Sequence, residues 1–237
     1  MVQPRRSTSA APDRPASGRV RVRRLAERGR YERACINAIL DEGFVCHVGV
    51  LGPDGPVVIP TAYGRDGDRL YLHGAPANAM LRAAGGSQIC VTVTLVDGLV
   101  LARSAFHHSI NYRSVVIYGS GEEVTDLEEK ETALAGIVEH LIPGRGADAR
   151  PPTAEELRAT RVVRVLLDEA AAKVRSGGPK DDEADLILPV WAGELPLLPA
   201  TGPPVAVAGL PADLRPPDYV TGYRRGRHAR LGQADPN

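Results

Sequence analysis

Residues 44–63, FVCHVGVLGPDGPVVIPTAY, decide the fold. They contain two runs rich in β-branched residues, 44–51 and 56–63, on either side of the turn sequence Gly-Pro-Asp-Gly. Glycine supplies the positive φ that a tight hairpin turn needs. The stretch therefore predicts two antiparallel strands joined by a hairpin.

Further strands follow the hairpin at short spacing. Apolar runs predict them at residues 69–73, 87–96, 99–104, 112–124 and 160–167. Asp97-Gly98 is predicted to be a hairpin turn between the second and the third of these runs. The sheet is therefore expected to continue as a meander of antiparallel strands.

Helical periodicity is confined to a few segments. Apolar residues at helical spacing predict a helix over 31–41, and composition predicts a short one over 76–84. Asp126 is the predicted N-cap of a third helix over 127–141. Six or seven strands with one short crossing helix are typical of a mainly β, α+β chain that forms an antiparallel barrel, and not of a doubly wound parallel sheet.

Composition limits the possible partners. The chain has 237 residues, of which 43% are hydrophobic and 24% charged, so it can bury one sizeable core. Lys and Arg together number 29, as do Asp and Glu, so no overall field attracts nucleic acid or an anionic membrane. A small molecule is therefore the expected partner.

The two ends differ from the middle in composition. Residues 1–30 are rich in Arg, Ser, Ala and Pro and contain no apolar stretch long enough for a signal peptide or a membrane helix, so they are predicted to be a disordered, basic tail of a cytoplasmic protein. Residues 31–175 are expected to form the barrel. Residues 176–237 form a Pro/Gly-rich arm, expected to wrap over the barrel or a partner subunit and to end in a flexible tail.

The three cysteines show no disulfide or zinc-site spacing. Cys35, Cys46 and Cys90 are odd in number and far apart, which favours small core residues in a reducing compartment. Lys180-Asp-Asp-Glu183 is interpreted as a solvated loop, so no metal site is predicted.

The strand region concentrates polar side chains. No dinucleotide loop, Walker motif, His-Glu-x-x-His or Gly-x-Ser-x-Gly is present, so hydrolase and P-loop functions lose support. Polar groups that converge on an apolar wall are typical of ligand sites in barrels. The candidates are Thr61, Tyr63, His73, Ser104, His107, His108, Ser109, Asn111, Tyr112, Arg113 and Ser114.

One polar segment resembles a known family. Residues 102–119, ARSAFHHSINYRSVVIYG, resemble the flavin-nucleotide-binding branch of the pyridoxamine 5′-phosphate oxidase-like proteins, close to the Nim-type nitroimidazole-resistance reductases. The resemblance covers about residues 29–198. Further segments that agree are Gly43-Phe-Val-Cys-His47, Val58 to Gly64, Leu70 to Gly74, Lys180 to Glu183 and Leu188 to Gly193.

The resemblance implies a split β-barrel of the FMN-binding type, with two subunits that hold FMN at their interface. The second barrel strand would run along the flavin ring, and the phosphate would lie near the next strand and the short helix. An arginine on a later strand would also reach the cofactor. Carried over to this sequence, the cofactor-binding residues are Ile59, Pro60, Thr61, Ala62, Tyr63, His73, Asn78, Arg113 and Ser114.

One departure affects the phosphate site. Family members often carry Ser with Arg or Lys in the short helix, where this chain has Ala77, Asn78 and Ala79. Arg82, one turn later, is a substitute candidate. Trp191, the only tryptophan, is either an anchor of the arm in a groove or a ring that stacks over the cofactor from the neighbouring subunit.

The activity implied is that of an FMN-dependent oxidoreductase, which passes electrons from a reduced nicotinamide to a small-molecule acceptor. His107 and His108 are candidate catalytic residues, although only one of two neighbours on a strand can face a pocket. The alternatives are a non-catalytic flavin-binding protein, and a haem-binding split barrel with His107 or His73 as axial ligand. A deazaflavin is an alternative to FMN.

Overall fold

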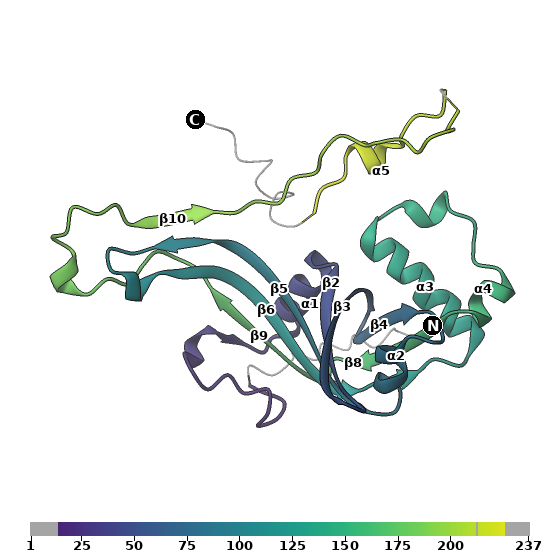
Figure 1. Cartoon of the computed structure of the whole chain (residues 1–237), viewed down its shortest axis with the longest axis horizontal. Coiled ribbons are helices and arrows are strands. Elements are labelled where there is room, and N and C mark those ends of the chain that lie inside the picture. The colour runs from purple at the N-terminus through teal and green to yellow at the C-terminus, as the bar shows by residue number, and fades with distance from the viewer. Residues whose placement is uncertain (1–13, 212, 226–237) are drawn as a thin grey trace, which may run out of the picture.

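The strands form one open, antiparallel sheet in the computed structural model, which describes residues 14–211 and 213–225 (Figure 1). Among these residues the sheet has ten strands in the order β1-β9-β6-β5-β2-β3-β4-β8-β7, and β10 pairs with β5. The bounds are β1 Gly29–Arg30, β2 Val45–Gly52, β3 Gly55–Asp66, β4 Arg69–Gly74, β5 Gln88–Leu101, β6 Ser109–Ser120, β7 Glu122–Glu123, β8 Arg161–Leu166, β9 Glu169–Arg175 and β10 Gly193–Pro196. The predicted split-barrel fold is thus confirmed.

The described part of the chain also forms five α-helices and four 3₁₀ turns. None in the described part of the chain is long and apolar enough to cross a membrane. Their bounds are α1 Arg33–Glu42, α2 Ala79–Ala84, α3 Leu127–Leu141, α4 Ala154–Arg158 and α5 Asp218–Thr221, with 3₁₀ turns η1 Ala26–Arg28, η2 Ala105–His107, η3 Arg145–Ala147 and η4 Glu183–Asp185.

The barrel is split along β3. Residues 55–62 of this strand pair with β2, whereas only its last four residues, 63–66, pair with β4. The other edge of residues 55–62 has no strand partner among the described residues. The sheet therefore opens between β3 and β4, and it opens directly before Tyr63.

Alternating residues of the strands fill the interior together with α1 and α2. Cys46, Val48 and Val50 point inward from β2, and the polar or small residues between them do not. Helix α1 buries Ile36, Ile39 and Leu40, its apolar stripe. The Tyr63 hydroxyl donates a 2.6 Å hydrogen bond to the Leu40 carbonyl and ties β3 to this helix.

Helix α3 covers the outside of β3 and β4. Asp126 caps it by accepting a hydrogen bond from the Glu129 amide, as predicted. Its buried residues Ala133 and Ile137 pack with Tyr71 and Val162 in a second, smaller core. Gly64 is the point of closest approach between β3 and this helix, since a Cβ there would lie 2.8 Å from the Ile137 Cα.

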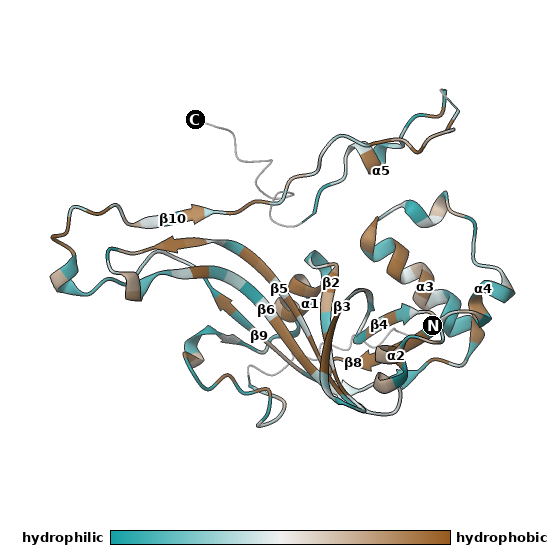
Figure 2. Cartoon of the chain, in the orientation of Figure 1, coloured by the Kyte–Doolittle hydropathy of each residue, from teal (hydrophilic) through white to brown (hydrophobic). Residues whose placement is uncertain are grey.

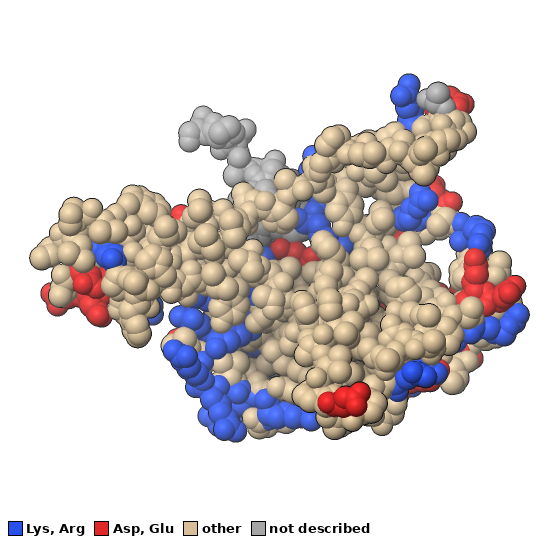
Figure 3. Space-filling view, in the orientation of Figure 1, with Lys and Arg blue, Asp and Glu red and all other residues tan. Residues whose placement is uncertain are grey.

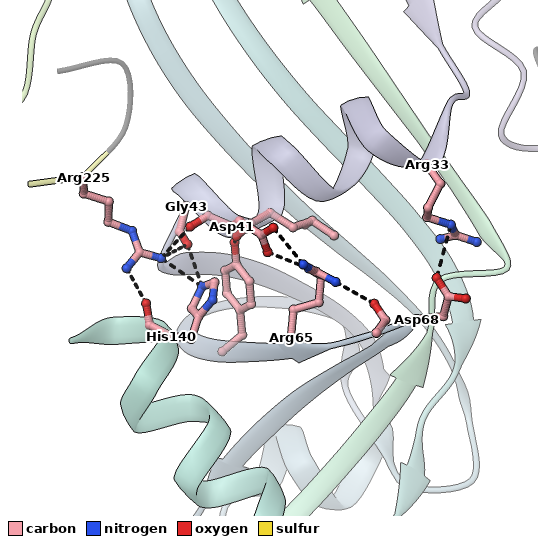
Figure 4. A network of polar contacts seen from close by, with 10 residues as sticks. Arg33, Asp41, Gly43, Arg65, Asp68, His140 and Arg225 are labelled. Atoms are coloured by element: carbon pink, nitrogen blue, oxygen red, sulfur yellow. Dashed lines mark hydrogen bonds and ion pairs between the residues drawn. The ribbon is translucent and has the colours of Figure 1, made fainter. Parts of the chain in front are cut away.

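The arm, residues 176–225, runs back over its own barrel. Strand β10 extends the sheet beside the last residues of β5, whose end is apolar (Figure 2). Near the end of the arm, the Tyr223 hydroxyl donates to the Leu141 carbonyl at 2.8 Å. Arg225 donates to carbonyl oxygens at the C-terminal ends of α1 and α3 (Figure 4), among them those of Glu42, Gly43 and His140. A cation at helix C-termini is favourable, so Arg225 fastens the arm.

Two strand predictions were wrong. Asp97-Gly98 is not a turn, because β5 continues through it to Leu101 and the register with β6 shifts between Val96 and Gly98. A β-bulge of this kind uses the same residues as a hairpin turn. Strand β9 was missed, because Ala170-Ala-Ala172 lacks the β-branched residues that mark a strand.

The tail prediction also needs correction. Residues 14–30 are not a disordered tail: Val20 is buried, Arg19 pairs with Glu169, and β1 pairs with β9. They pack because β9 would otherwise be an uncovered edge of the sheet. Residues 1–13 of that tail lie outside the described residues. The flexible end predicted for the arm, from Arg215 on, is described as far as Arg225, and this part is not a free tail, because it forms α5 and Arg225 bonds to the Glu42 and Gly43 carbonyls.

Gly64→Ala should destabilise the protein by about 1 to 3 kcal/mol, because the added methyl group pushes against the backbone of α3. Gly136→Ala, on α3 itself, is the control. Its Cβ would meet no atom within 4 Å, so the change should raise stability by about 0.5 to 1 kcal/mol through helix propensity. Urea unfolding of both variants measures the difference, and equal effects would contradict the packing of α3 on Gly64.

Candidate functional site

The open edge of β3 is the first part of the candidate site. Ile59 and Pro60 are exposed there, and Thr61 and Ala62 are half-buried. An unpaired strand edge presents backbone N–H and C=O groups to whatever lies beside it. Such an edge can hydrogen-bond a flat ring that carries donors and acceptors along one side. Four of the predicted ring-contact residues therefore lie together at an accessible place.

His73 stands at the end of this opening. The last residue of β4 that pairs with β3 is Leu72, and His73 follows it at the point where the two strands separate. Its Nδ1 is buried and has no hydrogen-bond partner among the described residues. Burial lowers the pKa of His73 below its usual value. The imidazole is therefore neutral near pH 7 and has an uncommitted ring nitrogen, as a metal ligand requires.

The loop into α2 completes this side of the site. Asn78 caps α2, since its Oδ1 accepts a hydrogen bond from the Leu81 amide at 3.1 Å. Arg82 lies in the last turn of α2, away from the loop. The sequence analysis missed Arg161, which the β4–β8 register places opposite Gly74. Arg161 forms an ion pair with Glu123 at 3.2 Å, and it is the cation that the register brings to this loop.

Tyr63 differs from its neighbours on β3. It is fully buried in the barrel, with its hydroxyl bonded to Leu40, and burial raises its pKa well above the usual range. Its side chain thus belongs to the core and does not face the open edge.

Arg113 is not at the open edge either. It lies on β6, which β5, β2 and β3 separate from β4 in the sheet. Its guanidinium pairs with Glu42 through two hydrogen bonds of 2.5 and 2.6 Å, and with Asp97 at 2.7 Å. The bond to Glu42, more than any other contact, raises the pKa of Arg113. Two carboxylates already neutralise this cation, so within one chain the geometry does not support its predicted role at a phosphate.

The remaining predicted residues are dispersed. Ser114 donates to the Lys173 carbonyl at 3.4 Å, across the β6–β9 pair. His107 and His108 lie in the loop between β5 and β6, where His107 meets Asp182 at 3.3 Å and His108 Nδ1 meets the Ser104 carbonyl at 2.9 Å. Trp191 is 67% exposed on the arm, with its ring against Gly193. None of these four joins His73 in the structure.

A cavity lies under the arm, and the sequence analysis did not predict it. Its volume is about 1310 Å3. Figure 3 shows charged atoms of both signs in the recess between arm and barrel. The cavity is lined by β5 and β6 around Arg113, by the C-terminal ends of α1 and α3, by Arg175, and by residues 196–201 and 223–225 of the arm. The sequence feature that could have indicated this cavity is the apolar run at residues 195–198 of the arm.

Comparison with known proteins identifies the family. The family model for pyridoxamine 5′-phosphate oxidase matches residues 32–174, more than half of the chain. The chain belongs to this family. A search of curated proteins gives no match.

Two solved structures resemble the whole chain. The flavocytochrome Anf3 from Azotobacter vinelandii is 39% identical, with a TM-score of 0.85 over 90% of this chain and 99% of that one. An FAD- and haem-binding protein from Mycobacterium smegmatis is 32% identical, with a TM-score of 0.80 over 84% of this chain and 98% of that one. A protein from Bacteroides thetaiotaomicron described as a 5-nitroimidazole antibiotic resistance protein is 29% identical, with a TM-score of 0.50 over 60% of this chain and 83% of that one.

Arg113→Ala should destabilise the protein by about 3 to 5 kcal/mol, because it leaves two largely buried carboxylates without a counter-charge. Arg164→Ala is the matched control. Arg164 also pairs with two carboxylates but is 32% exposed, so its loss should cost only about 0.2 to 1 kcal/mol per pair. Thermal and urea unfolding compare the two variants. If Arg113→Ala lowers the free energy of unfolding no more than Arg164→Ala does, the ion pairs of Arg113 are not important for stability.

Proposed function

We propose that this chain binds both a flavin and a haem and transfers electrons between them. The flavin lies along the open edge of β3, and His73 binds the haem iron. The unpartnered Nδ1 of His73, at the fork between β3 and β4, is the observation that carries the proposal. The two relatives that match most of the chain support it, since one is named a flavocytochrome and the other an FAD- and haem-binding protein.

His73 would suit the role of haem ligand better than the other described histidines. His140 Nε2 is bonded to the Gly43 carbonyl at 2.8 Å and lies beside Arg225. His107 and His108 have polar partners in the β5–β6 loop, and His47 is exposed on β2. A haem ligand needs a neutral imidazole with a free nitrogen in a partly apolar surrounding. Among these five, His73 alone has a buried ring nitrogen without a hydrogen-bond partner.

The flavin that we propose is FAD in place of the FMN predicted from the sequence. FMN ends in a phosphate monoester, which needs cations or several donors to hold it. The loop into α2 has Ala77 and Ala79 beside Asn78, whose side-chain oxygen caps the helix. Arg161 is already paired with Glu123. This weak phosphate site favours a flavin that gains binding energy from an additional nucleotide.

The chain's own residues then have separate tasks. The backbone of residues 59–62 would orient the flavin ring, and His73 would hold the iron. When bound, the flavin supplies two-electron and one-electron chemistry, and the haem supplies one-electron chemistry. The proposal includes a reduced nicotinamide as electron donor, a small-molecule acceptor, and a homodimer in a reducing, cytoplasmic compartment. The family resemblance supports these points, and the three free cysteines agree with such a compartment.

The test is the absorption spectrum of protein produced with haem and flavin supplied. The wild type should show a Soret band together with flavin absorption. His73→Gly should lose most of the haem and keep the flavin, and added imidazole should restore the Soret band, because it supplies the missing ligand. His108→Gly is the control, since His108 is exposed and should leave both chromophores in place.

Each outcome decides one part of the proposal. A wild type with flavin but no haem would refute the haem part. Full haem content in His73→Gly would refute the assignment of the ligand. Chromatography of the released flavin distinguishes FAD from FMN. Release of FMN would refute FAD as the flavin and support the prediction made from the sequence.

A further inference from the structure

The cavity under the arm has the properties of a second ligand site. It is separate from the open edge of β3 and from His73, neither of which lines it. Its volume of about 1310 Å3 is large enough for a drug-sized molecule, for which pockets of about 300 to 1000 Å3 are usual. We propose that it binds a small molecule with an apolar body and one anionic group, held by Arg175.

Arg175 is a buried cation without an anionic neighbour in bonding distance. The residue is only 8% exposed, and no carboxylate of the described residues forms an ion pair with it. Its guanidinium donates to the Asn111 side chain and to the carbonyls of Gly177 and Gly178, at 3.0 and 3.2 Å for the last two. These bonds use three of the five N–H groups of an arginine. The other two N–H groups have no hydrogen-bond partner in the described part of the chain, and Arg175 lines the cavity.

Electrostatics supports the same conclusion. Burial, and next the charge of Arg28, lower the pKa of Arg175, and the charge of Glu194 offsets only part of this effect. Glu194, the nearest acid in this network, bonds to Asn111 and not to Arg175 itself. In the same cavity, Glu42 and Asp97 are both committed to Arg113. An anion that enters would thus meet a guanidinium that has no ion pair among the described residues, while two of the three acids in the lining are neutralised by Arg113 and the third, Glu194, is bonded to Asn111.

The cavity wall provides the apolar half of the site. Phe44, Leu95 and Leu141 line it from the barrel, and Leu197 and Leu198 line it from the arm. These side chains come from four parts of the chain that the arm brings together. The arm also provides Arg224, whose only hydrogen bond in the described chain goes to the Tyr223 carbonyl. A second cation at the rim favours the same kind of ligand.

The barrel and the arm form the cavity together. The family match ends at residue 174, directly before Arg175 and the arm. The match to Anf3 leaves only a tenth of this chain uncovered, which is less than the length of the arm, so at least part of the arm is matched. The match to the Bacteroides protein covers only 60% of this chain. The part of the cavity wall that the arm provides thus lies outside the region that the family model matches.

Two fluorescent probes with the same apolar body test the proposal on the full chain. One, 8-anilinonaphthalene-1-sulfonate, carries an anion, and the other, N-phenyl-1-naphthylamine, is neutral. The wild type should bind both. Arg175→Gln should weaken binding of the sulfonate by about ten- to a hundredfold, the range for a hydrogen bond to a charged group, and leave the neutral probe within twofold.

Further variants make the result independent of folding. Arg224→Gln changes an exposed side chain and should lower sulfonate affinity less than Arg175→Gln does. Arg158→Gln, an exposed arginine on α4 away from the cavity, should change neither probe. Octanoate should displace the sulfonate from the wild type, and octanol should do so much less.

The proposal fails if the wild type does not bind the sulfonate, or if Arg175→Gln binds it as the wild type does. It also fails if FAD displaces the sulfonate competitively, because the cavity would then be part of the flavin site. The measurement needs neither flavin nor haem, so its failure is distinguishable from failure of the proposed function.

Discussion

Strand β3 pairs with β2 along residues 55–62 but with β4 only along its last four residues, and the candidate site depends on that mismatch. A fully paired barrel would satisfy the backbone of residues 55–62 internally and leave no edge for a ligand. It would also enclose the position of His73. Tyr63 keeps the opening from spreading, because its hydroxyl fastens β3 to α1 at the residue where the strands separate.

The structure distributes its buried charges in two ways. Arg113 is closed in ion pairs with Glu42 and Asp97, which join α1, the bulge of β5 and strand β6. Such a group holds elements together and offers little charge to a ligand. Arg175 has neutral partners and free donors beside a cavity, and Arg225 uses its donors on helix carbonyls to hold the arm above it. The partners of each arginine thus determine whether it joins elements of the fold, binds a ligand or holds the arm in place.

The sequence predicts the parts of the fold that local chemistry specifies. The hairpin of β2 and β3 and the limits of α3 follow from turn residues, alternation and an N-cap, and all are present. The bulge at Asp97 was misread because an Asp-Gly pair suits a turn and a bulge equally. Strand β9 was missed because alanine favours helices, and only pairing with β6 makes those residues a strand.

The candidate site was predictable only where it follows a strand. Ile59, Pro60, Thr61, Ala62 and His73 lie on neighbouring strands, so the expected hairpin places them near one another. The partners of Arg113 are 71 and 16 residues away in sequence, and no local pattern reveals them. Arg161 and the cavity were missed for the same reason, because register and a returning arm create them.

Hydrogen exchange of the backbone amides tests the central claim most directly. Exchange is compared with and without FAD, using peptides that cover residues 55–66, the cavity and the rest of the sheet. If the open edge of β3 binds the flavin, FAD should slow exchange in residues 57–62, apart from Pro60, which has no amide hydrogen. Unchanged exchange in these residues, with protection appearing under the arm or elsewhere, would contradict the account.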